Sequence, residues 1–149
     1  MQTTGTERTE DILDTLGSLL RGEISAVETY RQAGAKITDT KLGSTLETSR
    51  RSHETRVQLL REKIMKLGGK PPEGSGAWGT FAKLVEGGAK AFGERAAIAA
   101  LEEGEDKGLR DYRDALGKLS GEARIFVENL LIEQERTHLM LSGAKKTFH

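Results

Sequence analysis

The hydrophobic residues of this chain recur with the 3.6-residue period of amphipathic α-helices, and no stretch shows the alternation expected of strands. We predict four helices from this pattern. They run from about Thr9 to Ala33, Asp39 to Gly68, Glu94 to Leu116 and Ser120 to Gly143. The sequence therefore predicts one all-α domain over residues 9–143, with a flexible N-terminal tail over residues 1–8 and a C-terminal tail over residues 144–149.

The lengths of the connections predict how the helices are arranged. The first and second helices, like the third and fourth, are joined by only about three to six residues, so each pair must form an antiparallel hairpin. Between Gly68 and Gly93 lie about 25 residues that are rich in glycine and contain both prolines. A helix of about 27 residues is about 40 Å long, and a connection of this size can return along the whole bundle. We therefore predict a long crossover between the second and third helices over residues 68–93, rather than an up-down-up-down bundle.

Apolar residues recur at roughly helical spacing inside the predicted crossover. They predict a short helix that caps or flanks the bundle, and they are Trp78, Phe81, Leu84, Val85 and Phe92. We interpret the single tryptophan as a hydrophobic plug or as a contact in a homodimer, rather than as a ligand-binding residue.

Six side chains of the kind that bind metals fall on, or beside, the apolar stripes of the four helices. They are Glu23, His53, Glu102, Glu105, Glu135 and His138. A carboxylate taken out of water costs several kcal/mol unless it is paired or coordinated, so six such residues in one layer indicate a site. The last two also have the Glu-x-x-His spacing by which one helix offers two ligands to a metal centre.

Residue counts from the turns place these side chains at matching heights. Glu23 lies about 15 residues before the first turn and His53 about 15 residues after it, so at 1.5 Å per residue they should meet across the hairpin. The same count from the second turn gives two further pairs at adjacent levels, Glu105 with Glu135 and Glu102 with His138. We therefore expect four helices to surround one or two metal ions near mid-bundle.

Composition narrows the function classes. Lysine and arginine together number 23, as do aspartate and glutamate, and this balance argues against nucleic acid or an acidic membrane surface as the main partner. The absence of cysteine excludes disulfides, thiol catalysis and cysteine-ligated zinc or iron–sulfur sites. No apolar run approaches the roughly 18–20 residues of a membrane span, and we expect a cytoplasmic protein. Gly-rich phosphate loops and nucleophile elbows are missing as well.

The chain resembles the ferritin-like superfamily, and in particular a group of small bacterial ferritin-like proteins of unknown function. The resemblance lies in the segments LLRGEISAVETYRQA, LLREKIMKLGGKPPEGSGAWG and ALEEGEDKGLRDYRDAL. It implies a four-helix bundle with the crossover after the second helix. Di-metal members of the superfamily use Glu from the first and third helices and Glu-x-x-His from the second and fourth, which matches Glu23, His53, Glu102, Glu135 and His138 in this sequence.

One ligand of that pattern is missing from the second helix. The residue three positions before His53 is Arg50 instead of Glu, and its positive charge disfavours an ordinary di-iron centre unless the side chain turns outward. Glu105 would compensate for the missing carboxylate, since it faces the same space; a single metal, or none, is the alternative. The arginines of the second helix are most simply interpreted as a solvated face, and they are Arg50, Arg51, Arg56 and Arg61.

Two functions follow from these residues. In the first, the six Glu and His ligands bind iron or manganese, and the bound metal reacts with oxygen or peroxide, as in a ferroxidase-type oxidoreductase. Glu102 or Glu105 would then bridge or cap the metal, and the other four would be terminal ligands. In the second, the same residues form a metal-free network, with Glu102 and Glu105 paired to an arginine such as Arg50, in a stress-associated helical scaffold or dimerisation module.

Overall fold

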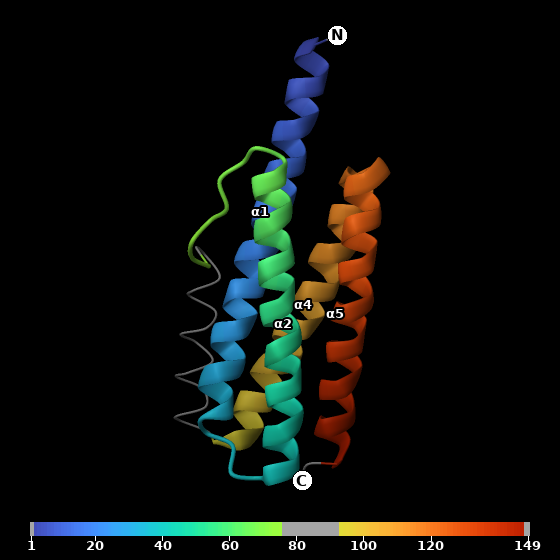
Figure 1. Cartoon of the computed structure of the whole chain (residues 1–149). Coiled ribbons are helices and arrows are strands. Elements are labelled where there is room, and N and C mark those ends of the chain that lie inside the picture. Colours follow the sequence, from blue (N-terminus) through green and yellow to red (C-terminus); the bar gives the residue numbers. More distant parts are fainter. Residues whose placement is uncertain (1, 76–92, 148–149) are drawn as a thin grey trace.

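The computed structural model describes residues 2–75 and 93–147, and every regular element within those ranges is an α-helix. Four helices follow one another along the chain (Figure 1), and they are α1 (Gln2–Gly34), α2 (Thr40–Lys66), α4 (Glu94–Lys118) and α5 (Gly121–Thr147). The predicted all-α fold class is therefore confirmed. Over the described residues, no helix combines the length and the apolar character that crossing a bilayer needs.

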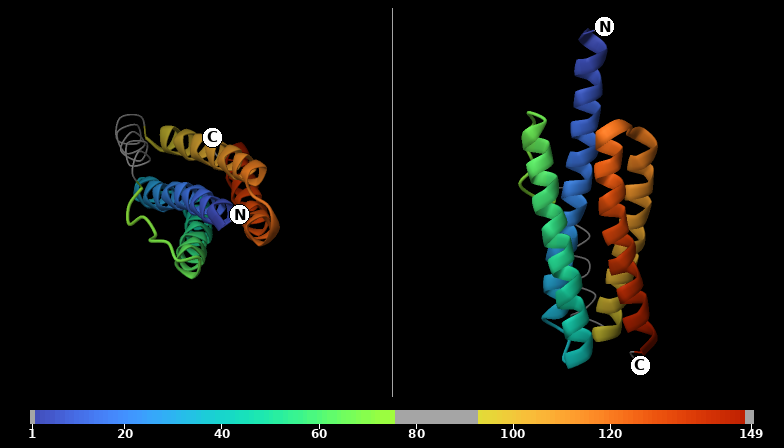
Figure 2. Two further views of the ribbon diagram at one scale, coloured as in Figure 1. Left: turned by 90° about the horizontal axis from the view of Figure 1, so that it is seen from above. Right: turned by 45° about the vertical axis from the view of Figure 1, so that its right-hand side comes forward.

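The helices pack as two antiparallel hairpins, α1 with α2 and α4 with α5. Seen end-on, the order around the bundle is α1, α2, α5 and α4 (Figure 2). α2 ends at one end of the bundle and α4 begins at the other (Figure 1), so the chain between them must cross the whole bundle length. The predicted long crossover is confirmed. The short helix predicted around Trp78 lies outside the described residues.

Local sequence signals set the ends of α2 where they were predicted. Asp39 is the N-cap, because its Oδ1 accepts a hydrogen bond from the backbone N–H of Leu42 at 2.7 Å. At the other end Gly68 has φ of 83°, a left-handed conformation that glycine adopts without a steric penalty and that ends helices.

Two helices are longer than the sequence predicted. α1 begins at Gln2 and α5 continues to Thr147, so most of the two predicted tails is helical. Neither extension contains proline, and a formed helix propagates more easily than it starts. The ammonium of Lys145 lies 2.8 Å from a carboxylate oxygen of Glu102 on α4, which ties the last turns of α5 to the neighbouring helix.

The hydrophobic core is divided into two clusters along the bundle axis. One cluster is centred on Leu16, Leu20, Leu60, Tyr112 and Val127. The other contains Tyr30, Leu42, Leu46, Ile98, Leu101 and Leu141. Each cluster supplies one tyrosine whose hydroxyl reaches a buried glutamate. A layer of polar side chains therefore lies between the two apolar clusters.

Close approach of α4 and α5 beside this layer depends on Gly108. A Cβ atom at this position would lie 2.4 Å from Nε2 of Gln134 on α5, a separation that real carbon and nitrogen atoms do not reach without a shift. Because the glycine leaves this space free, the Gln134 amide donates to the backbone carbonyl of Glu105 at 3.0 Å. The glycine in α4 thus lets a polar side chain of α5 hydrogen-bond to the backbone of α4.

Candidate functional site at mid-bundle

Six polar side chains from all four helices meet in the layer between the two apolar clusters. Each is at most 3% exposed, and they are Glu23 on α1, His53 and Arg56 on α2, Glu105 on α4, and Gln134 and Thr137 on α5. The α2 and α5 pairs are spaced three residues apart, which puts both members of a pair on one face of the helix. We call these six residues the polar centre.

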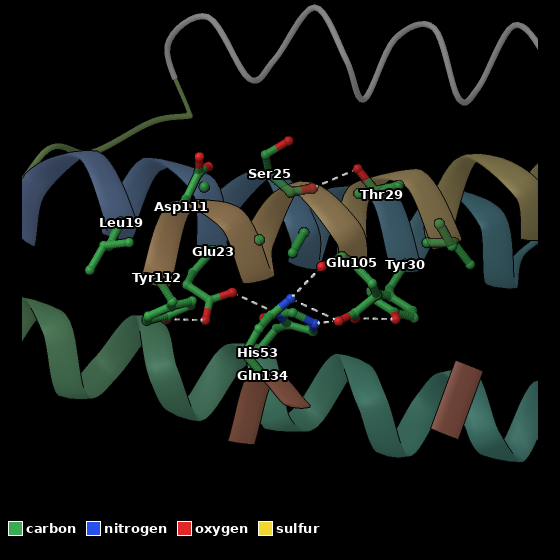
Figure 3. A pocket seen from close by; sticks show the side chains of 15 residues that line it. Leu19, Glu23, Ser25, Thr29, Tyr30, His53, Glu105, Asp111, Tyr112 and Gln134 are labelled. Carbon is green, nitrogen blue, oxygen red and sulfur yellow. Dashed lines mark hydrogen bonds and ion pairs between the residues drawn. The ribbon is translucent and has the colours of Figure 1, made fainter. Parts of the chain in front are cut away.

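His53 lies between the two carboxylates of the polar centre (Figure 3). Its Nδ1 is 2.6 Å from Oε1 of Glu23, and its Nε2 is 2.8 Å from Oε2 of Glu105. A carboxylate can only accept, so both ring nitrogens donate when the imidazole is protonated. The charged form of His53 therefore links α1 and α4 through α2.

Arg56 extends the network to α5. Its Nη1 lies 3.1 Å from Oε2 of Glu23 and also donates to the side-chain oxygen of Gln134. Its Nη2 donates to the Thr137 hydroxyl at 3.1 Å, and that hydroxyl donates in turn to Oε1 of Glu105 at 2.9 Å. One guanidinium thus contacts residues of two other helices directly, α1 and α5, and reaches Glu105 on α4 through the Thr137 hydroxyl.

The remaining acceptor positions of the two carboxylates are filled by neutral donors. The Tyr112 hydroxyl donates to Oε2 of Glu23 at 2.7 Å, and the Tyr30 hydroxyl donates to Oε2 of Glu105. The side-chain amide of Gln134 donates to Oε1 of Glu105 at 2.9 Å. Both buried carboxylates are therefore fully engaged by side chains of the protein, as burial of a charge requires.

The polar centre is electrically balanced. Burial alone would raise the pKa of Glu23, but the guanidinium of Arg56 and the imidazole of His53 hold it below its ordinary value. Burial likewise opposes ionisation of Glu105, whose pKa is nevertheless lowered, chiefly by His53. Burial and Arg56 act to lower the pKa of His53, yet the two carboxylates outweigh them and raise it. Two negative and two positive charges therefore cancel.

Burial also changes the acidity of the tyrosines. It raises the pKa of Tyr30 and that of Tyr112 well above the ordinary value of 10.0, and the glutamate that each hydroxyl touches raises it further. Both hydroxyls therefore stay protonated at neutral pH and act only as hydrogen-bond donors toward the carboxylates.

These pKa directions predict how stability depends on pH. The raised pKa of His53 means that its contribution is present below the ordinary value of 6.5 and is lost as pH rises through the raised value. The lowered pKa values of Glu23 and Glu105 mean that their contribution is present above 4.5 and is lost as pH falls through the lowered values. The free energy of unfolding should therefore peak between about pH 4.5 and 6.5.

Urea unfolding followed by circular dichroism at a series of pH values measures this profile. The decrease on the alkaline side should disappear in His53→Gln, because the titrating group is gone. His138→Gln is the matched control, since its side chain is partly exposed, and it should keep the decrease. An alkaline limb that survives in His53→Gln would contradict the assignment.

The structure brings together three of the six predicted site residues, Glu23, His53 and Glu105. The predicted meeting of Glu23 and His53 across the first hairpin is confirmed by their 2.6 Å contact. The other three predicted residues do not join them, and they are Glu102, Glu135 and His138.

The prediction that these three residues face the same centre is wrong in its geometry. Glu102 is only partly buried and pairs with Lys145, and Glu135 is exposed. His138 lies at the edge of the α4–α5 contact, with Nε2 at 2.6 Å from Oδ1 of Asp106. Neighbouring residues on a helix point about 100° apart, and here the inward positions are taken by Leu101 and Thr137.

Sequence reasoning missed the residue with the largest role in the polar centre. Arg56 was placed on a solvated face, but it is 1% exposed. The available signal was its position three residues after His53, on the buried line that continues to Leu60 and Ile64. Arg50 does turn outward instead, where it pairs with glutamates of its own helix.

The polar centre can be compared with the ligand pattern of di-metal four-helix bundles. Where the di-metal pattern has Glu, Glu-x-x-His, Glu and Glu-x-x-His along the four helices, this chain has Glu23, His53-x-x-Arg56, Glu105 and Gln134-x-x-Thr137. Two of the four carboxylates are kept, and the single histidine uses its two nitrogens on different carboxylates. Among the side chains that the structure describes, no group of three or more His, Asp or Glu is arranged to hold a metal ion. The residues present therefore do not fit a di-iron centre.

A small cavity of about 40 Å³ lies beside the polar centre, between α1 and α4 (Figure 3). Glu23, His53 and Glu105 are among its lining residues. The helices leave this space because their facing residues are small, namely Gly22, Ala26, Gly104 and Gly108. The volume suffices for a few water molecules at most, so the two carboxylates and the imidazole adjoin a space of solvent size.

Comparison with known proteins identifies a family and a fold. A family model described as "Domain of unknown function (DUF2383)" matches residues 11–118. No match was found among curated proteins. The bacterioferritin-related protein from Bacteroides fragilis, described as a dodecameric thioferritin, is a similar solved structure, with a TM-score of 0.68 and 14% identity over 93% of this chain and 86% of that one.

A second similar structure comes from the ferritin-like, diiron-carboxylate proteins of Bacillus anthracis, with a TM-score of 0.65 and 18% identity over 93% of each chain. At these identities the likeness concerns the fold, and it agrees with the predicted ferritin-like bundle. Since the family model covers more than half of the chain, the protein belongs to the family of the domain of unknown function DUF2383 and has a ferritin-like fold.

Proposed function

We propose that this chain is a metal-free member of the ferritin-like fold, in which the polar centre fixes the packing of four helices and the bundle serves as a helical scaffold. The observation that carries the proposal is the buried guanidinium of Arg56, which lies 3.1 Å from the Glu23 carboxylate. A permanent cation of the protein thus lies beside a carboxylate that a metal ion bound in the centre would need as a ligand.

Charge supports this proposal. Two buried carboxylates require about two positive charges nearby, and Arg56 and protonated His53 supply them within 2.6–3.1 Å. A divalent cation that entered the centre would meet both positive groups in a medium that screens charge poorly. It would also have to take a carboxylate away from each of them, so binding would break contacts that already satisfy the site.

Geometry supports it as well. A single metal ion bound through one nitrogen of His53 would reach only the carboxylate on that side of the ring, because Glu23 and Glu105 lie on opposite nitrogens. The hypothesis that iron or manganese binds to six Glu and His ligands stays a prediction. It would require Arg56 to leave the centre and three distant side chains to move inward.

Metal titration tests the proposal. Protein is titrated anaerobically with Fe(II), and separately with Mn(II), at neutral pH by calorimetry, and the metal content of the desalted protein is measured. We expect no stoichiometric binding. Binding of about one ion per chain, or two, would overturn the metal-free proposal.

Three variants show where any bound metal sits. Loss of that binding in Glu105→Gln with retention in Glu102→Gln would place the metal at the polar centre. Loss in Glu102→Gln and in His138→Gln would instead place it among the outer residues predicted from the sequence. Circular dichroism of each variant confirms that the bundle is intact before titration.

A further inference from the structure

We draw no further inference here: the strongest candidate, the small cavity between α1 and α4 beside the polar centre, belongs to the site already described, and its volume of about 40 Å³ admits water molecules alone.

Discussion

Replacing Arg56 with methionine is expected to lower the free energy of unfolding by about 3–5 kcal/mol, the usual cost of removing one partner from a buried ion pair. Methionine keeps much of the apolar stem and removes the guanidinium. The carboxylate of Glu23 then loses the cation at 3.1 Å, while Gln134 and Thr137 lose a donor. A domain of ordinary stability, about 5–15 kcal/mol, would lose a large share of it.

Urea unfolding at pH 7 measures this loss, and Arg50→Met is the matched control on the same helix. The Arg50 ion pairs join a partly buried arginine to two exposed glutamates of the same helix, and ion pairs at the surface are worth about 0–1 kcal/mol. The loss in Arg56→Met should shrink at acidic pH, where Glu23 becomes protonated and needs no cation. Equal losses for the two arginine variants would contradict the role assigned to Arg56.

Glu105→Gln is expected to lower the free energy of unfolding by about 3 kcal/mol, the scale of lost charge-assisted hydrogen bonds in a buried site. The substitution keeps the shape but replaces a pure acceptor with a group that also carries two N–H donors. Glu105 accepts from the side chains of His53, Tyr30, Gln134 and Thr137. An amide cannot accept all of these bonds, and the imidazole also loses one of its two counter-charges.

Glu102→Gln is the matched control, because Glu102 lies three residues away on α4 and only pairs with the partly exposed Lys145. Its loss should stay within about 0.5 kcal/mol, as is usual for surface substitutions. Thermal and urea unfolding at pH 7 measure the loss of stability in Glu105→Gln and in Glu102→Gln. If Glu102→Gln were the more damaging change, the inward face of α4 would have been assigned incorrectly.

The contacts of His53 with the two carboxylates show which parts of the polar centre could be predicted from the sequence. The polar layer could be predicted because charged residues on an apolar stripe are expensive to bury alone. Equal distances from the first turn also predicted the Glu23–His53 contact, since both helices rise by the same amount per residue. The roles of Tyr30 and Tyr112 could not be predicted, because a tyrosine hydroxyl gives no sequence signal of its hydrogen-bond partner.

The sequence by itself determined the fold class, the two hairpins and the crossover. Apolar period, capping residues and connection lengths are local properties, and each restricts the arrangement before any long-range contact forms. Asp39 as the cap of α2 is an example, because its partner Leu42 is only three residues away.

Only the tertiary structure decided which edge of each helix turns inward. Periodicity defines an apolar face about 100° wide, and neighbouring residues differ by the same angle, so Leu101 and Glu102 compete for one position. Packing against the other helices selected Leu101 on α4 and Thr137 on α5. The same packing places Arg56 inside the bundle, because the two buried carboxylates on other helices are stabilised by a nearby positive charge. The sequence of α2 alone does not show where those carboxylates lie.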